Sequence, residues 1–181
     1  NSHVYFTNVN AEFTIEQNAF MDSTINSISI HKNIETIGLW AFEDCSSLTT
    51  FNFEELSSFT TINLFAFRRC TALKELTLPP SFTTFGGVSI FGNSGLEHLV
   101  FEGEGLTTAG LPSTTFRTAY DLASITMPNT SCTTYATVVN LSTWGDNNYP
   151  NPQFIAVDTT APAFTNVTPT SSTSVDTTSV G

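Results

Sequence analysis

The sequence predicts an α/β repeat fold: a solenoid that stacks short parallel strands, one per coil, with short helical turns on the opposite side. The prediction rests on two observations. Residues 37–48 (IGLWAFEDCSSL) return as residues 62–73 (INLFAFRRCTAL), and each copy is followed at once by a short alternating run, 49–53 and 74–78. A unit of this kind that recurs about every 22 to 26 residues is typical of a solenoid.

Four columns of the unit recur in five registers. The aromatic column contains Phe20, Phe42, Phe67, Phe91 and Phe116. The small-residue column contains Ser23, Cys45, Cys70, Ser94 and Ala119, and the aliphatic column contains Ile25, Leu48, Leu73, Leu96 and Leu122. The inward strand positions are Ile28 and Ile30, Phe51 and Phe53, Leu76 and Leu78, Leu99 and Phe101, and Ile125 and Met127. We therefore expect the phenylalanines to form an aromatic spine inside the coils.

The hydrophobic period changes within each unit. The strand piece alternates with period two, which predicts one buried and one exposed face. The Ala-Phe-x-x-Cys-x-x-Leu piece is spaced for a short helical turn, and the unit is too short for a long crossover helix. A second apolar arc of variable length lies between them, and we expect an irregular backbone there. Its residues are Ile34 and Ile37, then Leu56, Phe59 and Ile62, then Phe82, Phe85 and Val88.

The chain divides into a repeat domain and a tail. Residues 1–20 are a degraded first unit, as expected of a terminal repeat that caps a stack. The regular repeats occupy about 20–127 and an irregular C-terminal cap occupies 128–157, so the predicted domain is 1–157. Residues 158–181 are about half Thr or Ser, which predicts a connector to another domain.

The composition excludes several classes of function. The net charge is −11, and the few Lys and Arg residues argue against binding to nucleic acid or to anionic membrane surfaces. No apolar run approaches the length of a membrane span, so we expect no membrane insertion. A neutral-polar, acidic surface favours an extracellular or cell-surface location. The missing initiator Met suggests a mature form from which a signal peptide has been removed.

The repeat columns resemble the BspA-like, treponemal-type leucine-rich repeats of surface proteins. The resemblance rests on Ile37-Gly38, Ala41-Phe42, Cys45 and Leu48, and on the same columns one unit later. It implies a right-handed, secreted or surface-attached solenoid, mainly bacterial, that is used for adhesion to host or bacterial proteins, without catalytic residues or cofactor. The tail from Asp158 resembles the entry to a bacterial immunoglobulin-like domain.

The outward strand positions form the candidate binding surface, because solenoids use such continuous faces for recognition. The predicted contributors are Ser29, His31, Asn52, Glu54, Glu75, Thr77, His98, Val100, Glu102 and Thr126. For any single residue, a plain solvated sheet is the alternative. Glu75 and His98 share a column in adjacent coils, so we expect a cross-strand ion pair between them rather than a catalytic base.

Three further groups of residues carry alternatives. Cys45 and Cys70 share a column, where a disulfide competes with two buried free thiols; Cys132 is isolated, which argues against a metal site. The Arg68-Arg69 pair with Lys74 suggests a solvated basic edge.

Glu54 and Glu102 lie two coils apart, about 9 to 10 Å, a spacing close to that of inverting glycosidases. A flat sheet lacks a water-excluding cleft, however, so we predict no enzyme. The favoured function is binding of an extracellular protein or glycan. The alternatives are a passive spacer that displays another domain and a glycan-active enzyme.

Overall fold

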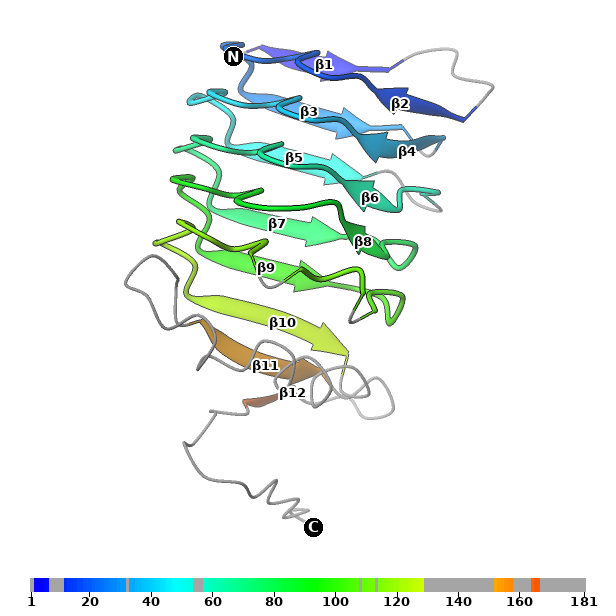
Figure 1. Ribbon diagram of the computed structural model, residues 1–181, viewed down its shortest axis with the longest axis vertical. Helices are drawn as coiled ribbons and strands as arrows, with labels where there is room; N and C mark the ends of the chain where they lie inside the picture. Colours follow the sequence, from blue (N-terminus) through cyan, green and yellow to red (C-terminus); the bar gives the residue numbers. More distant parts are fainter. Residues whose placement is uncertain are drawn as a thin grey trace.

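The computed structural model describes residues 2–6, 12–31, 33–53, 57–107, 109–112, 114–128 and 152–157, and the backbone of 164–166. These residues form a stack of coils with the N-terminus at one end (Figure 1). The strands are β1 (His3–Tyr5), β2 (Phe13–Ile15), β3 (Ser27–Ile30), β4 (Ile34–Ile37), β5 (Thr50–Phe53), β6 (Thr61–Ile62), β7 (Glu75–Leu78), β8 (Thr84–Phe85), β9 (His98–Phe101), β10 (Ser124–Pro128), β11 (Gln153–Val157) and β12 (Phe164–Asn166).

The predicted face of short parallel strands is present, with one strand per coil. It consists of two sheets in one layer, β1-β3-β5 and β7-β9-β10-β11-β12, and we call this layer the strand face. All pairs in it are parallel except β11 with β12. The inward residues alternate with outward ones as predicted, and all of them are buried except Phe53, which is half-buried. The predicted domain boundaries at 128, 157 and 158 fall next to residues outside the described set and stay predictions.

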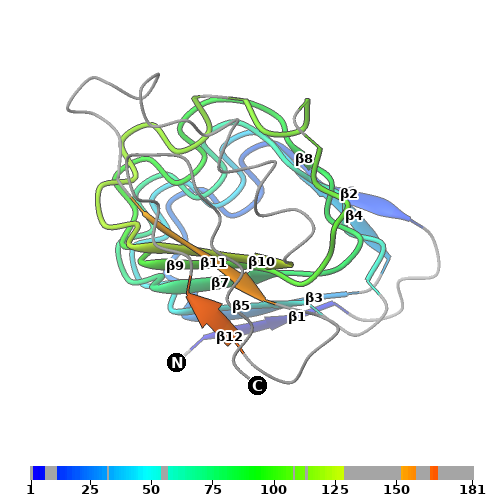
Figure 2. The ribbon, with the colours of Figure 1, turned by 90° about the horizontal axis from the view of Figure 1, so that it is seen from below.

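The variable arc between strand and turn is more regular than the sequence suggested. It forms a second parallel sheet, β2-β4-β6-β8, along the neighbouring side of the coils that contain β1, β3, β5 and β7 (Figure 2). Ile15, Ile37, Ile62 and Phe85 follow one another in register and are all buried. The spacing between the two strands still differs from coil to coil, and the register shifts between Phe13 and Thr14, so the expectation of an irregular arc is confirmed only in part. Leu56 of this arc lies outside the described residues.

The third side of each coil is built of tight turns, and the predicted short helical turns are not confirmed in the described parts of the chain. Backbone N–H groups alternate in direction here. Glu43 and Cys45 donate to carbonyls three residues back, whereas Phe42 and Asp44 donate to Ala66 and Arg68 of the next coil at 2.9 Å. An α-helix needs every N–H within its own segment. Residues with positive φ, such as Asp44 at 60°, interrupt helical geometry further.

The predicted aromatic spine runs through the middle of the stack. Phe20, Phe42, Phe67, Phe91 and Phe116 stack in sequence, with ring centroids 5.0, 5.4, 5.8 and 6.1 Å apart and planes within 11° of parallel. All but Phe20 are buried. Phe51 stands edge-on against both Phe42 and Phe67. The rings thus join neighbouring coils into one continuous core.

Candidate binding groove

The strand face places most of the predicted site residues side by side. Ser29 pairs with Asn52 across β3 and β5, and Thr77, Val100 and Thr126 follow one another across β7, β9 and β10. Asn52, Glu75, His98 and Glu102 are exposed; Ser29, His31, Thr77, Val100 and Thr126 are half-buried. Glu54 lies outside the described residues.

Glu75 and His98 are cross-strand neighbours, as predicted from their shared column. The predicted ion pair between them is not formed: Nδ1 of His98 lies 2.8 Å from the hydroxyl of Ser124 on the other side. The ion pair between these coils forms one residue earlier, where Lys74 Nζ lies 2.7 Å from Glu97 Oε1. Lys74 thus neutralises an acid beside β9 and leaves Glu75 facing solvent.

The strand face is interrupted at one place, between β5 and β7. At the other coil junctions, a carbonyl just before a strand accepts hydrogen bonds from the next coil. Lys74 O, for example, accepts from the N–H groups of Glu97 and His98 at 2.8 and 3.0 Å. One coil earlier, the equivalent hydrogen bonds would run from the N–H groups of Lys74 and Glu75 to Thr49 O. Neither bond forms between these described residues.

A proline removes one possible ladder bond at the far end of β7. In the intact ladder Glu102 N donates to Leu78 O at 3.0 Å. The equivalent residue one coil earlier is Pro79, which has no N–H to donate to the carbonyl of Phe53. This end of β7 therefore cannot close onto β5 by the usual ladder bond.

The same two coils are joined on their other two sides. In the second sheet, Thr83 and Thr84 both donate to Thr60 O at 3.0 Å. On the turn side, Phe67 donates to Ile90 O and Arg69 to Gly92 O, both at 2.9 Å. The coils are thus held together along the second sheet and the turns, and they part only on the strand face.

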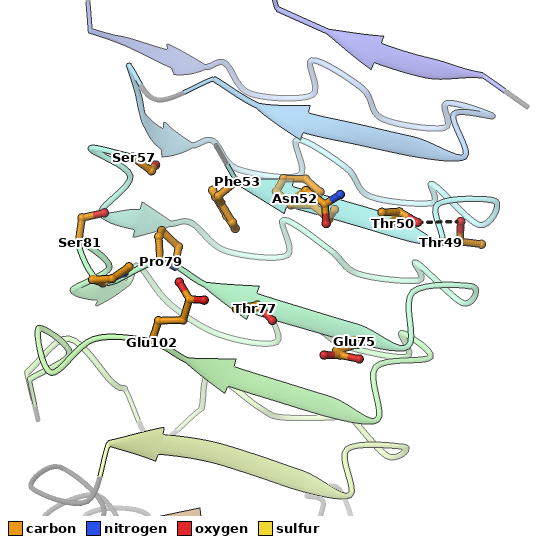
Figure 3. Close-up of a pocket in the computed structure, with 12 residues that line it drawn as sticks. Thr49, Thr50, Asn52, Phe53, Ser57, Glu75, Thr77, Pro79, Ser81 and Glu102 are labelled. Carbon is orange, nitrogen blue, oxygen red and sulfur yellow. Dashed lines mark hydrogen bonds between the residues drawn. The ribbon is translucent and has the colours of Figure 1, made fainter. Parts of the chain in front are cut away.

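A groove lies over this interruption, with a volume of about 1230 Å³ (Figure 3). Four of the predicted site residues line it: Asn52 from β5, Glu75 and Thr77 from β7, and Glu102 after β9. The remaining lining residues are Thr49, Thr50, Phe51, Phe53, Ser57, Pro79, Pro80 and Ser81. Ser29, His31, His98, Val100 and Thr126 lie elsewhere on the strand face.

The groove is acidic and rich in hydrogen-bonding groups. Glu75 and Glu102 supply negative charge, and the described residues of the lining include no Lys, Arg or His. Thr50, Asn52 and Thr77 add hydroxyl and amide groups. Among the described residues, no group of three His, Cys, Asp or Glu side chains could hold a metal ion. The arrangement suits recognition by hydrogen bonds and by attraction of positive charge.

A charge cluster occupies the turn side, where the sequence suggested only a solvated basic edge. The carboxylate of Glu43 is 2% exposed and pairs with Arg68 and, at 3.2 Å, with Arg69. Arg69 also binds Asp44 through two hydrogen bonds of 2.5 and 2.6 Å, which lower the pKa of Asp44. The acids sit one coil before the arginines, so the basic edge is partly solvated, as expected, but it is also paired with acids, which was not expected.

The two cysteines of the repeat column are free thiols in the core. Cys45 Sγ donates to Phe20 O and Cys70 Sγ to Phe42 O, each at 3.0 Å, so each thiol ties its turn to the preceding coil. Burial raises the pKa of Cys45 to about 11 and that of Cys70 well above the usual value for a thiol. Of the two alternatives that the sequence left open, the structure shows buried thiols. Cys132 lies outside the described residues.

Stacked parallel strands, with Phe, Cys and Leu columns that repeat from coil to coil, define a leucine-rich-repeat solenoid. The family comparison agrees: the model of the BspA type leucine rich repeat region matches residues 13–137 in 6 copies. The chain belongs to this family of BspA-type leucine-rich-repeat proteins.

Solved structures of leucine-rich-repeat proteins resemble the chain. One from Bacteroides capillosus is 28% identical, with a TM-score of 0.47, over 56% of this chain and 76% of that one. One from T. pallidum is 21% identical, with a TM-score of 0.49, over 65% of this chain and 53% of that one. The pneumococcal vaccine antigen PcpA is 23% identical, with a TM-score of 0.50, over 63% of this chain and 36% of its own.

At these levels of identity, the comparisons with solved structures concern the fold alone. The chain spans about half of the treponemal protein and about a third of PcpA. No curated protein sequence matches the chain significantly. In the part of the chain that the structure describes, no helix is long and apolar enough to span a membrane.

Proposed function

We propose that the chain is a non-enzymatic, cell-surface or secreted binding module that recognises an extracellular protein or glycan through its strand face. The observation that carries this proposal is the groove over the β5–β7 interruption, where residues of three coils surround unpaired strand edges. An open strand edge is a ready template for a partner, because its N–H and C=O groups still need hydrogen bonds.

The outward residues support binding over catalysis. Glu75 and Glu102 are both exposed, so neither carboxyl lies in a water-excluding pocket of the kind that catalysis usually needs. Thr, Asn and Glu side chains on a rigid stack give fixed hydrogen-bonding positions at low conformational cost. Membership of the BspA-type family and the fold shared with a vaccine antigen both favour a location at the cell surface or outside the cell.

Binding can be tested on arrays of extracellular matrix proteins, mucins and glycans, probed with the labelled chain. The double variant Glu75→Lys/Glu102→Lys reverses the charge of the groove. The control Glu12→Lys/Glu16→Lys makes the same change in net charge at two exposed residues beside β2, outside the groove lining.

We expect the groove variant to bind its array targets at least about tenfold more weakly than the unmodified chain, and the control variant to bind them equally well. Equal binding by both variants would move the site away from the groove. An array without targets, for a chain shown to be folded, would leave the spacer role as the explanation. Hydrolysis of any arrayed glycan would support the enzyme alternative.

A further inference from the structure

The β5–β7 interruption has the chemistry of a slot for a polypeptide backbone. Parallel strands direct the N–H and C=O groups of alternate residues to opposite neighbours. Lys74 and Leu78 turn their carbonyls to β9, so Glu75 and Thr77 turn their backbone groups to β5. The N–H group of Thr50 donates to the preceding coil, so the N–H and C=O groups of Phe51 face β7. Two strand edges therefore face each other without a bond between them.

The charge around the slot selects the partner. Glu75 lies on β7 and Glu102 follows β9, and the described lining residues include no basic side chain to neutralise them. The nearby Lys74 is already paired with Glu97. The whole chain carries a net charge of −11, which attracts cations at longer range. Charge complementarity thus favours a basic segment, and it disfavours acidic peptides and anionic glycans.

The core beneath the slot limits the size of the partner's side chains. The aromatic spine continues without a break through the coils concerned, with Phe42, Phe67 and Phe91 stacked at 5.4 and 5.8 Å. Phe67 is fully buried and leaves no room for a large side chain pointing inward. A strand in the slot must therefore carry small residues on its inner face and can carry long ones on its outer face.

The slot has to widen when a strand enters. Cα atoms of β5 and β7 come within 8 Å of each other. A strand between them would hold the two about 9.6 Å apart, twice the usual spacing. The widening is thus at least about 2 Å on the strand face, while the hydrogen bonds that join the coils lie on the other two sides, along the second sheet and the turns.

We propose that the β5–β7 slot docks an extended segment of a partner protein in which basic residues alternate with small ones. The segment's backbone adds a strand between β5 and β7, and its basic side chains meet Glu75 and Glu102. This inference rests on the proposed function, because it names the partner of the same groove. Strand addition gives affinity through the backbone, and the alternating pockets and charges give specificity.

A synthetic peptide tests the proposal with the full chain. The probe is the capped heptapeptide Lys-Ser-Lys-Ser-Lys-Ser-Lys, and its binding is followed by amide NMR shifts of the protein. We expect saturable shifts at Phe51, Glu75 and Thr77, and at least about tenfold weaker binding to the variant Glu75→Gln/Glu102→Gln. The variant Glu12→Gln/Glu16→Gln removes the same charge elsewhere and should bind as well as the unmodified chain.

Two altered peptides separate strand addition from charge attraction alone. Replacing each Ser by Leu puts large groups on one face, and N-methylating alternate amides removes the donors of one edge. We expect both changes to abolish binding. Equal binding by either altered peptide would overturn the proposal in favour of a purely electrostatic contact.

Two other outcomes would also overturn it. A neutral chitin or dextran oligosaccharide that shifts Glu75 and Thr77 when the peptide does not would assign the slot to glycans. In the second outcome, Glu75→Lys/Glu102→Lys abolishes binding to the array targets, but no peptide binds to the unmodified chain. That result would support the proposed function of the groove and refute strand addition by a basic segment.

Discussion

Phe42 and Phe67 lie face to face, with ring centroids 5.4 Å apart and planes inclined by 5°. The two residues belong to successive coils, so each ring contributes to the contact between coils as well as to its own. Phe67 also stacks on Phe91 at 5.8 Å and meets the edge of Phe51 at 4.9 Å. Its side chain is therefore enclosed on several sides by other aromatic rings.

Phe67→Ala should lower the free energy of unfolding by about 3 to 5 kcal/mol, because it opens a cavity in the middle of the spine. Denaturant melts followed by circular dichroism measure this change. Phe65→Ala is the control, since Phe65 lies two residues away but is half-buried on the turn side. A loss below about 1 kcal/mol for Phe67→Ala would contradict the role of the spine.

Glu43→Gln should cost about 1 to 3 kcal/mol, because it leaves Arg68 and Arg69 without a carboxylate that is 2% exposed. The two arginines are partly exposed, at 32% and 44% of their side chains, so water compensates part of the loss. Glu16→Gln, at an exposed position, should change stability by less than about 0.5 kcal/mol. Equal losses in the two variants would show that the cluster contributes nothing to stability.

Stability should also fall in acid through Asp44. Arg69 lowers the pKa of Asp44 below its ordinary value of 3.8. A lowered pKa in the folded state means that the contribution is complete above the unfolded value. It is then lost as pH falls below about 4 and through the folded pKa. Melting temperatures measured between pH 6 and pH 2 should drop less steeply for Asp44→Asn than for the unmodified chain. An equal fall in melting temperature with pH for both proteins would refute a contribution of ionised Asp44 to stability.

The buried thiols should be inert in the folded protein. Thiolate is the reactive form, and burial raises the pKa of Cys45 to about 11 and that of Cys70 also. Cys132→Ser removes the third cysteine, so any reaction with Ellman's reagent at pH 8 then reports on these two. We expect release of the coloured product only after denaturant is added. Rapid reaction without denaturant would mean that the turn side opens readily.

The sequence predicted the columns of the fold because they depend on local pattern. Phe42, Cys45 and Leu48 recur one coil later at the same spacing, and repetition at that spacing leaves stacking as the arrangement that buries all of them. The helical turns were predicted from the same spacing and were not confirmed. A spacing of three and four also fits consecutive turns, and the choice between them depends on whether backbone N–H groups bond within the coil or to the next one.

The groove was predictable only in part. Asn52, Glu75, Thr77 and Glu102 were identified as outward residues, but no sequence feature favoured them over His98 or Thr126. Pro79 occupies the position of Glu102 and cannot donate to the preceding coil, but Pro128 occupies the same position in β10, which still pairs with β9, so the proline alone does not predict the interruption. The charge cluster was missed for a related reason: Glu43 and Asp44 lie 25 residues from their arginines, and only the register of the coils brings them together.

Amide exchange should show the interruption directly. Glu75 and Thr77 turn their N–H groups toward β5 and have no backbone partner there, whereas Leu76 and Leu78 of the same strand turn toward β9 and pair with it. Exchange rates along β7 should therefore alternate, with Glu75 and Thr77 at least about 100-fold faster than their two neighbours.

The same measurement on β9 supplies the comparison, since β9 has a partner on both sides and should show protection throughout. Binding of the basic peptide should slow exchange at Glu75 and Thr77 and leave β9 unchanged. Uniform protection along β7 in the free protein would mean that β5 and β7 pair directly in solution, which would close the groove.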